Sequence, residues 1–184
     1  MPSIAVHMAV AKLVGEKINI TDQLFIKGNL LPDIINLDDS HHKIDGKYFL
    51  IPDISYFKEH LDLKNNLYLG YYTHLLLDKY FLEEYLPKYT TDINNFNNGT
   101  IYKEYDLINY EIVNEFNLDV DYLTKILSDY DVDVNKNILE NNIKFLHSKN
   151  KGNTEYLKSD IMEFIKDISN TIVNDIKDLG DLIW

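Results

Sequence analysis

The feature that most constrains the fold of this chain is an apolar run over residues 68–81 that carries His74 and Asp78 four positions apart. The length and composition of the run predict a helix, and this spacing then places an imidazole and a carboxylate on one face, one turn apart. A carboxylate is costly to bury unless a cation or hydrogen-bond donors compensate its charge. Two interpretations stay open. Either the pair binds a metal ion, or it is structural, with the two side chains bonded to each other or Asp78 paired with a lysine.

Other residues of the types that bind metals gather before residue 80. His7 lies near the start, Asp33 follows a turn-forming Gly-Asn-Leu-Leu-Pro segment, and His41 and His42 form a doublet. The chain has no cysteine, which excludes disulfides, thiolate zinc sites and a cysteine nucleophile. A metal would have to be held by histidine, carboxylate and carbonyl groups, and these suit zinc, iron or manganese.

Charge and composition narrow the possible partners. The net charge is −12, from 18 basic and 30 acidic residues, and every basic residue is lysine. Without arginine no side chain can grip a phosphate through two parallel bonds, and an acidic surface repels polyanions, so nucleic acid is a disfavoured partner. The start lacks a basic leader region, and its apolar stretch breaks at Lys12, which predicts a cytoplasmic protein without a transmembrane segment.

Helical spacing of apolar residues recurs along the chain, whereas only residues 48–51 resemble a strand. The predicted helices cover about residues 3–17, 22–27, 54–61, 66–87, 103–116, 119–130, 134–147 and 154–179, with the apolar stripe of the last one forming core. Asp22, Asn65 or Asn66, Asp119 and Thr154 are expected to cap the helices that begin near them. Gly28 and Asn29 are expected to form a turn, and residues 88–100 a loop. The sequence therefore predicts one all-α domain over 1–184, a multi-helix bundle with a metal site between helices. The ligands lie in about residues 1–87, and about 101–184 complete the bundle.

Four local patterns follow one another in the first half. They are Met1-Pro2-Ser3 followed by His7, Gly28-Asn29-Leu30-Leu31-Pro32-Asp33, His41-His42, and Gly70-Tyr71-Tyr72-Thr73-His74-Leu75-Leu76-Leu77-Asp78. Together they resemble the zinc-dependent phospholipase C family over about residues 1–87. This family has an all-α fold, and its superfamily also contains single-strand-specific nucleases. The resemblance implies a metal cluster buried among helices, with zinc ions bridged by water or hydroxide and a carboxylate.

The resemblance also implies which residues of this chain bind metal. The implied ligands are His7, Asp33, His41 or His42, His74 and Asp78. Asp33 corresponds to the bridging carboxylate and is the candidate catalytic residue, because it would also orient the attacking water. His7 corresponds to the early histidine of the N-terminal metal site.

The second half departs from the family pattern. The family's later helix carries a further histidine and a His-x-x-x-Glu pair, whereas the only later histidine here, His147, is followed four residues on by Lys151. Asp106 and Glu111 are candidates to supply a substitute oxygen ligand. The N-terminal tryptophan that the family's secreted lipases use as a ligand is also absent, since the only tryptophan is Trp184.

The first hypothesis is a metal-dependent hydrolase of phosphoric esters that acts through a metal-bound hydroxide on one or two zinc ions. Its expected substrate is a small soluble phosphoester rather than bulk lipid or nucleic acid. The alternative is a non-catalytic helical binding or regulatory domain of the same fold, with a structural metal or none. A helical phosphohydrolase of the His-Asp class is a weaker alternative because the chain contains no His-Asp dipeptide. The sequence does not specify the oligomeric state.

Overall fold

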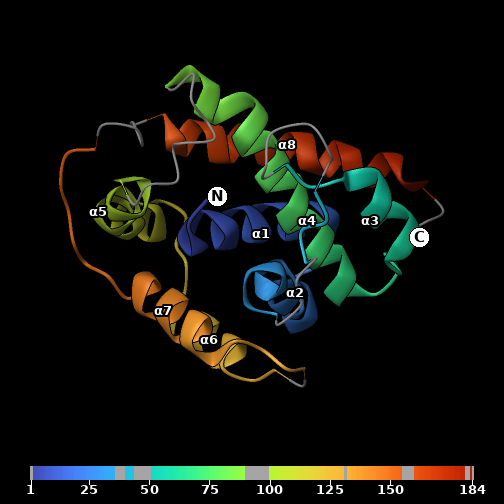
Figure 1. The fold of residues 1–184 in the computed structure, drawn as a ribbon, viewed down its shortest axis with the longest axis horizontal. Helices are drawn as coiled ribbons and strands as arrows, with labels where there is room; N and C mark the ends of the chain where they lie inside the picture. Colours follow the sequence, from blue (N-terminus) through green and yellow to red (C-terminus); the bar gives the residue numbers. More distant parts are fainter. Residues whose placement is uncertain are drawn as a thin grey trace.

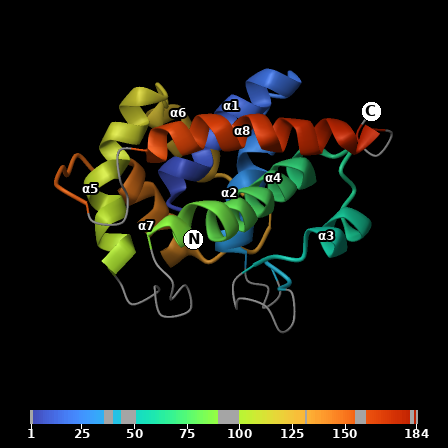
Figure 2. The same cartoon turned by 90° about the horizontal axis from the view of Figure 1, so that it is seen from above.

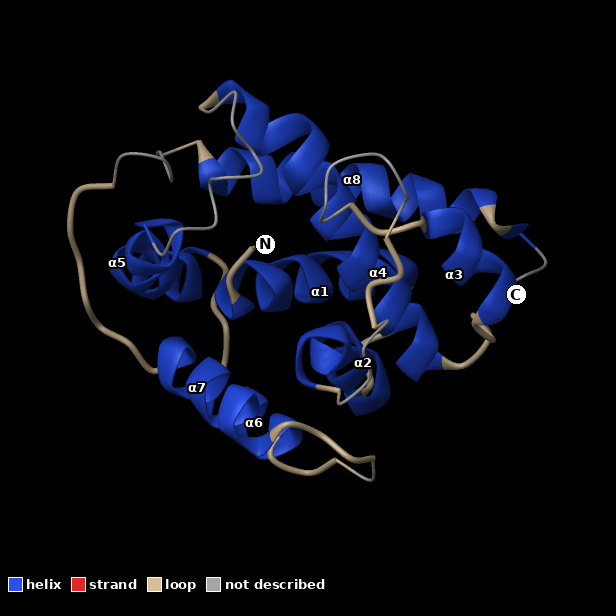
Figure 3. Ribbon diagram, viewed as in Figure 1, coloured by secondary structure: helices blue, strands red, loops and turns tan. Residues whose placement is uncertain are grey.

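A computed structural model describes residues 2–35, 40–43, 51–89, 100–130, 132–154, 160–180 and 183. These residues form an all-α fold without strands (Figures 1 and 3). The predicted fold class is thereby confirmed, while most of the strand-like segment at 48–51 and of the expected loop at 88–100 lies outside the described residues. In the described part of the chain no helix combines the length and the apolar character that crossing a membrane requires.

The described residues contain eight α-helices. They are α1 (Ile4–Ile18), α2 (Gln23–Ile34), α3 (Ile54–His60), α4 (Asn66–Tyr80), α5 (Thr100–Glu115), α6 (Val120–Leu127), α7 (Lys136–Leu146) and α8 (Ile161–Asp178). After α4 the chain continues through a π-helical turn (Phe81–Tyr85) and a short 3-10 turn (Leu86–Lys88). The only pairings of strand type among the described residues are two isolated bridges, Ile35 with Val134 and Lys43 with Pro52.

Helix α1 runs through the centre of the molecule, between α8 on one side and α2 on the other (Figures 1 and 2). It also contacts α4, α5 and α7. This position explains its composition, since a helix covered on all sides has to be apolar around most of its circumference. The predicted stripe of α8 is buried as expected, from Ile161 to Ile176. A polar residue on α1 is therefore held in the interior, and His7 is one.

Several helix starts follow the predicted capping chemistry. The side chains of Asp22 and Asp119 each accept a hydrogen bond of 2.9 Å from the backbone three residues on, and Asn65 caps α4. Such caps satisfy backbone N–H groups that a helix start otherwise leaves unpaired. The predicted cap at Thr154 is wrong, because α8 begins at Ile161.

The prediction that a turn at Gly28 and Asn29 ends the second helix is also wrong. Helix α2 continues through both residues and through Pro32 to Ile34. The reason is tertiary packing against α4, the most extensive contact between two helices of the described residues. A Cβ atom at position 28 would overlap the backbone oxygen of Leu67. Glycine is therefore needed here for close helix contact rather than for a turn, and Asp33 lies in the last turn of a helix rather than in irregular backbone.

Candidate metal centre

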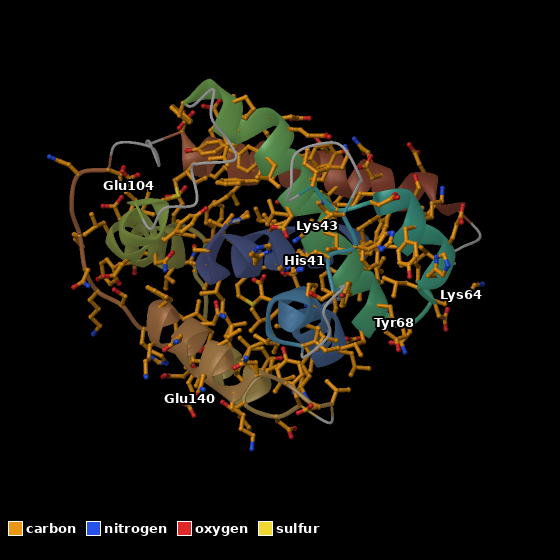
Figure 4. The ribbon with its side chains drawn as sticks, in the orientation of Figure 1. His41, Lys43, Lys64, Tyr68, Glu104 and Glu140 are labelled. Carbon is orange, nitrogen blue, oxygen red and sulfur yellow. The ribbon has the colours of Figure 1, made fainter. Side chains whose placement is uncertain are left out.

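Four segments of the chain bring histidines and carboxylates together between the helices. His7 comes from α1, Asp33 from the end of α2, His41 from the segment 40–43, and His74 and Asp78 from α4. In Figure 4 the labelled His41 lies near the middle of the molecule, beside α1, α2 and α4. The residues on α1 and α4 are completely buried, whereas the side chains of His41 and Asp33 keep 14% and 23% exposure. The cluster therefore reaches the surface only at these two residues.

Asp78 lies at the centre of the cluster, because its two carboxylate oxygens face the imidazoles of different histidines. Its Oδ1 lies 3.5 Å from Nε2 of His7, and its Oδ2 lies 3.4 Å from Nε2 of His41 and 3.2 Å from Nε2 of His74. None of these contacts has hydrogen-bond geometry. Both oxygens and all three Nε2 atoms lack a hydrogen-bond partner among the described residues. Five buried polar atoms that converge without hydrogen bonds are a costly arrangement, which a bound cation would compensate.

Three of these atoms and Oδ1 of Asp33 form a set whose four nitrogen-to-oxygen separations suit a single metal ion. Oδ1 of Asp33 lies 3.6 Å from Nε2 of His41 and 3.7 Å from Nε2 of His74. The two Nε2 atoms lie 3.4 and 3.2 Å from Oδ2 of Asp78. Tetrahedral zinc with ligands at 2.0–2.1 Å separates them by about 3.3 Å from one another. Three of the four distances are longer than an ordinary hydrogen bond, and all four are close to what shared coordination requires.

His7 extends the cluster on the far side of Asp78. Its ring stacks on that of His74 with centroids 3.9 Å apart, and neither of its nitrogens has a hydrogen-bond partner among the described residues. His7, His74 and Asp78 form one group that can hold a metal ion, and Asp33, His41 and His74 form another. The two groups share His74, so they belong to one cluster.

The charges within the cluster shift the pKa values of His74 and His7 in opposite directions. Burial alone would lower the pKa of His74, but the carboxylates of Asp78 and Asp33 outweigh burial and raise its pKa to about 9. Burial and the neighbouring charge of His74 lower the pKa of His7. Burial opposes the charge on Asp78, yet His74 and the other imidazoles hold the pKa of its carboxyl well below the usual range. Without metal the core of the site is therefore an Asp78 carboxylate beside a protonated His74 and a neutral His7.

Hydrogen bonds at Nδ1 direct the Nε2 atoms of two histidines toward the cluster. Nδ1 of His74 donates to the backbone oxygen of Asn29 at 2.7 Å, and Nδ1 of His41 bonds the hydroxyl of Ser40 at 2.9 Å. Since these partners occupy Nδ1, the Nε2 atom is the one left to bind a metal. The roles of Asn29 and Ser40 were not predicted from the sequence. Ser40 could have been noticed because it precedes His41, but no local signal shows that the Asn29 carbonyl faces His74.

The structure separates the adjacent histidines, of which one was expected to bind metal. His42 stacks on Tyr56 with ring centroids 3.7 Å apart, and Tyr56 in turn stacks on His60. The His42 backbone oxygen accepts a 2.7 Å hydrogen bond from Asp53. Neither metal-holding group among the described residues includes His42. His41 is thus the one placed at the centre.

This separation predicts unequal effects of two single substitutions. His41→Ala is expected to weaken zinc binding at least 10-fold, because it removes one of four converging ligand atoms. His42→Ala should leave zinc affinity within about 3-fold of the native value. Competition with a chromophoric chelator measures both. Equal losses in the two variants would contradict the assignment of His41.

The candidate substitute ligands in the second half, Asp106 and Glu111, belong to neither metal-holding group of the described residues. The carboxylate of Asp106 accepts hydrogen bonds of 2.7 Å from Ser148 and 2.6 Å from Asn150, and Glu111 is exposed. His147 follows the last turn of α7, as expected, and bonds Thr124. Within the described residues the ligand-type groups that converge all belong to the first half of the chain.

No family model, no curated protein and no solved structure matches this chain. What the centre does therefore has to be inferred from its own residues.

Proposed function

We propose that this protein is a metal-dependent hydrolase of phosphoric esters. The observation that carries the proposal is the set of buried nitrogen and oxygen atoms without a hydrogen-bond partner among the described residues, in which the three imidazole Nε2 atoms face the oxygens of Asp78 at 3.2–3.5 Å. A mixed set of imidazoles and carboxylates is typical of metallohydrolase centres. The resemblance of the first half to the zinc-dependent phospholipase C family supports the same chemistry.

Zinc is the metal that we propose, with one or two ions. Two imidazoles and two carboxylates with nitrogen-to-oxygen separations of 3.2–3.7 Å suit zinc, although iron and manganese accept the same ligand types. The first ion would be held by Asp33, His41, His74 and Asp78. His7 and the second oxygen of Asp78 would hold a second ion, which makes Asp78 rather than Asp33 the carboxylate best placed to bridge the two.

A zinc centre supplies a water of lowered pKa and neutralises the charge that develops on a phosphoryl group. The chain's own residues define how a substrate would meet it. Asp33 and His41 are the partly exposed members, so a phosphoester would approach along this edge. The free oxygen of Asp33 would accept a hydrogen bond from the attacking water and orient it. Buried His7 and His74 would hold their ligand atoms in place without contacting solvent.

The substrate that we propose is a small soluble phosphoester. The net charge of −12 opposes the approach of a polyanion, and the chain has no arginine with which to grip a phosphate backbone. A small ester with one or two negative charges needs less compensation, and a dinuclear or mononuclear metal centre can provide it.

One observation favours the alternative of a structural metal in a non-catalytic domain. Four protein atoms converge on the first position, and structural zinc sites are typically closed by four protein ligands, whereas catalytic sites keep a position for water. For hydrolysis at this position, a water would have to replace Asp33 as a ligand, or the zinc would have to accept water as a fifth ligand. The His7 side of Asp78, with fewer protein ligands, is the other place for a water.

Turnover decides between the two functions. The zinc-loaded chain is expected to hydrolyse at least one member of a panel of small phosphomonoesters and phosphodiesters, and Asp33→Asn should reduce that rate at least 100-fold, since it weakens both a ligand and the water-orienting group. Asp53→Asn, which alters an aspartate that caps α3, is the matched control and should retain the rate. A chain that binds zinc fully but hydrolyses no member of the panel would support the structural alternative and contradict the hydrolase.

A further inference from the structure

The backbones of α2 and α4 touch at one turn of each helix, directly beside the metal centre. A Cβ atom at Gly28 would overlap the backbone of Leu67, and one at Gly70 would overlap the backbone of Phe25. The helices can therefore approach this closely only because both positions are glycine. Gly28 and Gly70 belong to patterns that the metal chemistry leaves unexplained.

Asn29 lies in this contact and touches α4 at two levels. Its side-chain Nδ2 donates to the backbone oxygen of Gly70 at 3.4 Å, and its own backbone oxygen accepts from Nδ1 of His74 at 2.7 Å. Gly70 and His74 are four residues apart on α4, as Asn29 and Asp33 are on α2. The contact of Asn29 with Gly70 thus lies one turn before the place where Asp33 and His74 converge at 3.7 Å.

Stability alone does not explain an asparagine at this position. Its side chain is completely buried, its one described side-chain bond is long, and its Oδ1 atom has no hydrogen-bond partner among the described residues. A buried acceptor without a partner destabilises a fold, so alanine should be tolerated at this site. The side chain is then best explained by what it does to its neighbours.

We propose that Asn29 is a positioning residue for the metal centre. Its side-chain bond to Gly70 fixes the position of α2 along α4, and its backbone oxygen thereby stays bonded to Nδ1 of His74. The inference rests on the metal centre of the proposed function. The side-chain bond ties the two helices at the glycine contact, and the carbonyl then presents Nε2 of His74 toward Asp33 and Asp78. Without the hydrogen bond from Asn29 to Gly70, the two helices could shift at this turn, and the ligand atoms would no longer hold their positions.

The test is the zinc affinity of Asn29→Ala. We expect zinc binding at least 10-fold weaker than in the native chain, with an altered visible spectrum of the cobalt-substituted protein and a Tm of the metal-free form within a few degrees of native. The matched control is Asn114→Ala, since the side chain of Asn114 also donates to a backbone oxygen, that of Tyr110 at 2.7 Å, at an exposed position of α5. Native zinc affinity and a native cobalt spectrum in Asn29→Ala would overturn the inference. A native chain that binds no zinc would instead remove the metal centre itself.

A second pair of variants tests the glycine contact. Gly70→Ala and Gly15→Ala both force a Cβ against backbone, but Gly15 lies at the end of α1, where its Cβ would meet Ile20. We expect Gly70→Ala to weaken zinc binding at least 10-fold more than Gly15→Ala. The Nδ1 proton of His74, observed by nitrogen-resolved NMR of the zinc form, should be protected in Gly15→Ala and exchange rapidly in Gly70→Ala. Equal zinc affinity and equal protection in the two variants would overturn the role of the contact.

Discussion

Asp78→Asn is expected to abolish zinc binding and, with it, any turnover. The substitution keeps the size of the side chain but removes the negative charge that faces three imidazoles at 3.2–3.5 Å. Loss of a group that only hydrogen-bonds a ligand lowers metal affinity about 10–100-fold. Loss of Asp78, which is itself a ligand, should therefore lower zinc affinity more than about 100-fold. Elemental analysis after equilibration with zinc and gel filtration measures the bound ion.

The same variant separates a metal centre from a structural His-Asp pair. If Asp78 served only as the partner of His74, the amide would leave a buried imidazole without its counter-charge and destabilise the fold, and the native chain would bind no zinc. Asp106→Asn is the control, because Asp106 is a carboxylate bonded to Ser148 and Asn150. It should retain native zinc content. Zinc bound equally by the native chain and by Asp78→Asn would contradict the assignment.

Zinc is expected to stabilise the native chain strongly against heat. A ligand that binds only the folded state at 1,000 times its Kd adds about 4 kcal/mol. For a chain of this size each kcal/mol shifts Tm by about 2–4 °C, so the expected increase is about 8–16 °C. Calorimetry with zinc and with a chelator measures it, and Asp78→Asn should show almost no shift. An equal shift in that variant would mean that zinc binds elsewhere.

The increase in Tm caused by zinc should grow with pH, because a proton and the metal compete for Nε2 of His74. In the metal-free fold the pKa of His74 is raised to about 9 from an ordinary 6.5. Its contribution to metal-free stability is therefore fully present below pH 6.5 and is lost as pH rises through about 9. Zinc requires the neutral ring, so its binding improves over that same window. The shift in Tm caused by zinc should be larger at about pH 8 than at about pH 6. A shift independent of pH would contradict competition at His74.

The sequence predicted the elements whose signals are local. Asp22 and Asp119 cap the helices that they were expected to cap, and the apolar stripe of α8 faces the core. The prediction failed where packing overrides local preference. Gly28 reads as a turn signal along the chain, but its lack of a side chain serves contact with α4, which no local pattern reveals.

The same distinction applies to the centre. The spacing of His74 and Asp78 indicated a buried pair on one helix face, and the structure places both in the interior, facing His7 and His41. Which of the adjacent histidines turns inward depended on the stacking of His42 on Tyr56, a contact between segments that spacing cannot show. The backbone oxygen of Asn29 was likewise beyond prediction, since any residue type carries one.

The most direct test of the metal centre is anomalous X-ray scattering at the zinc edge from crystals of the native chain grown with zinc. We expect a strong peak between Oδ1 of Asp33, Nε2 of His41, Nε2 of His74 and Oδ2 of Asp78, at about 2.0–2.1 Å from each. A second, weaker peak between His7 and Oδ1 of Asp78 would indicate a dinuclear centre. Crystals that contain zinc at other places, with no peak among these four atoms, would contradict the metal centre and every function derived from it.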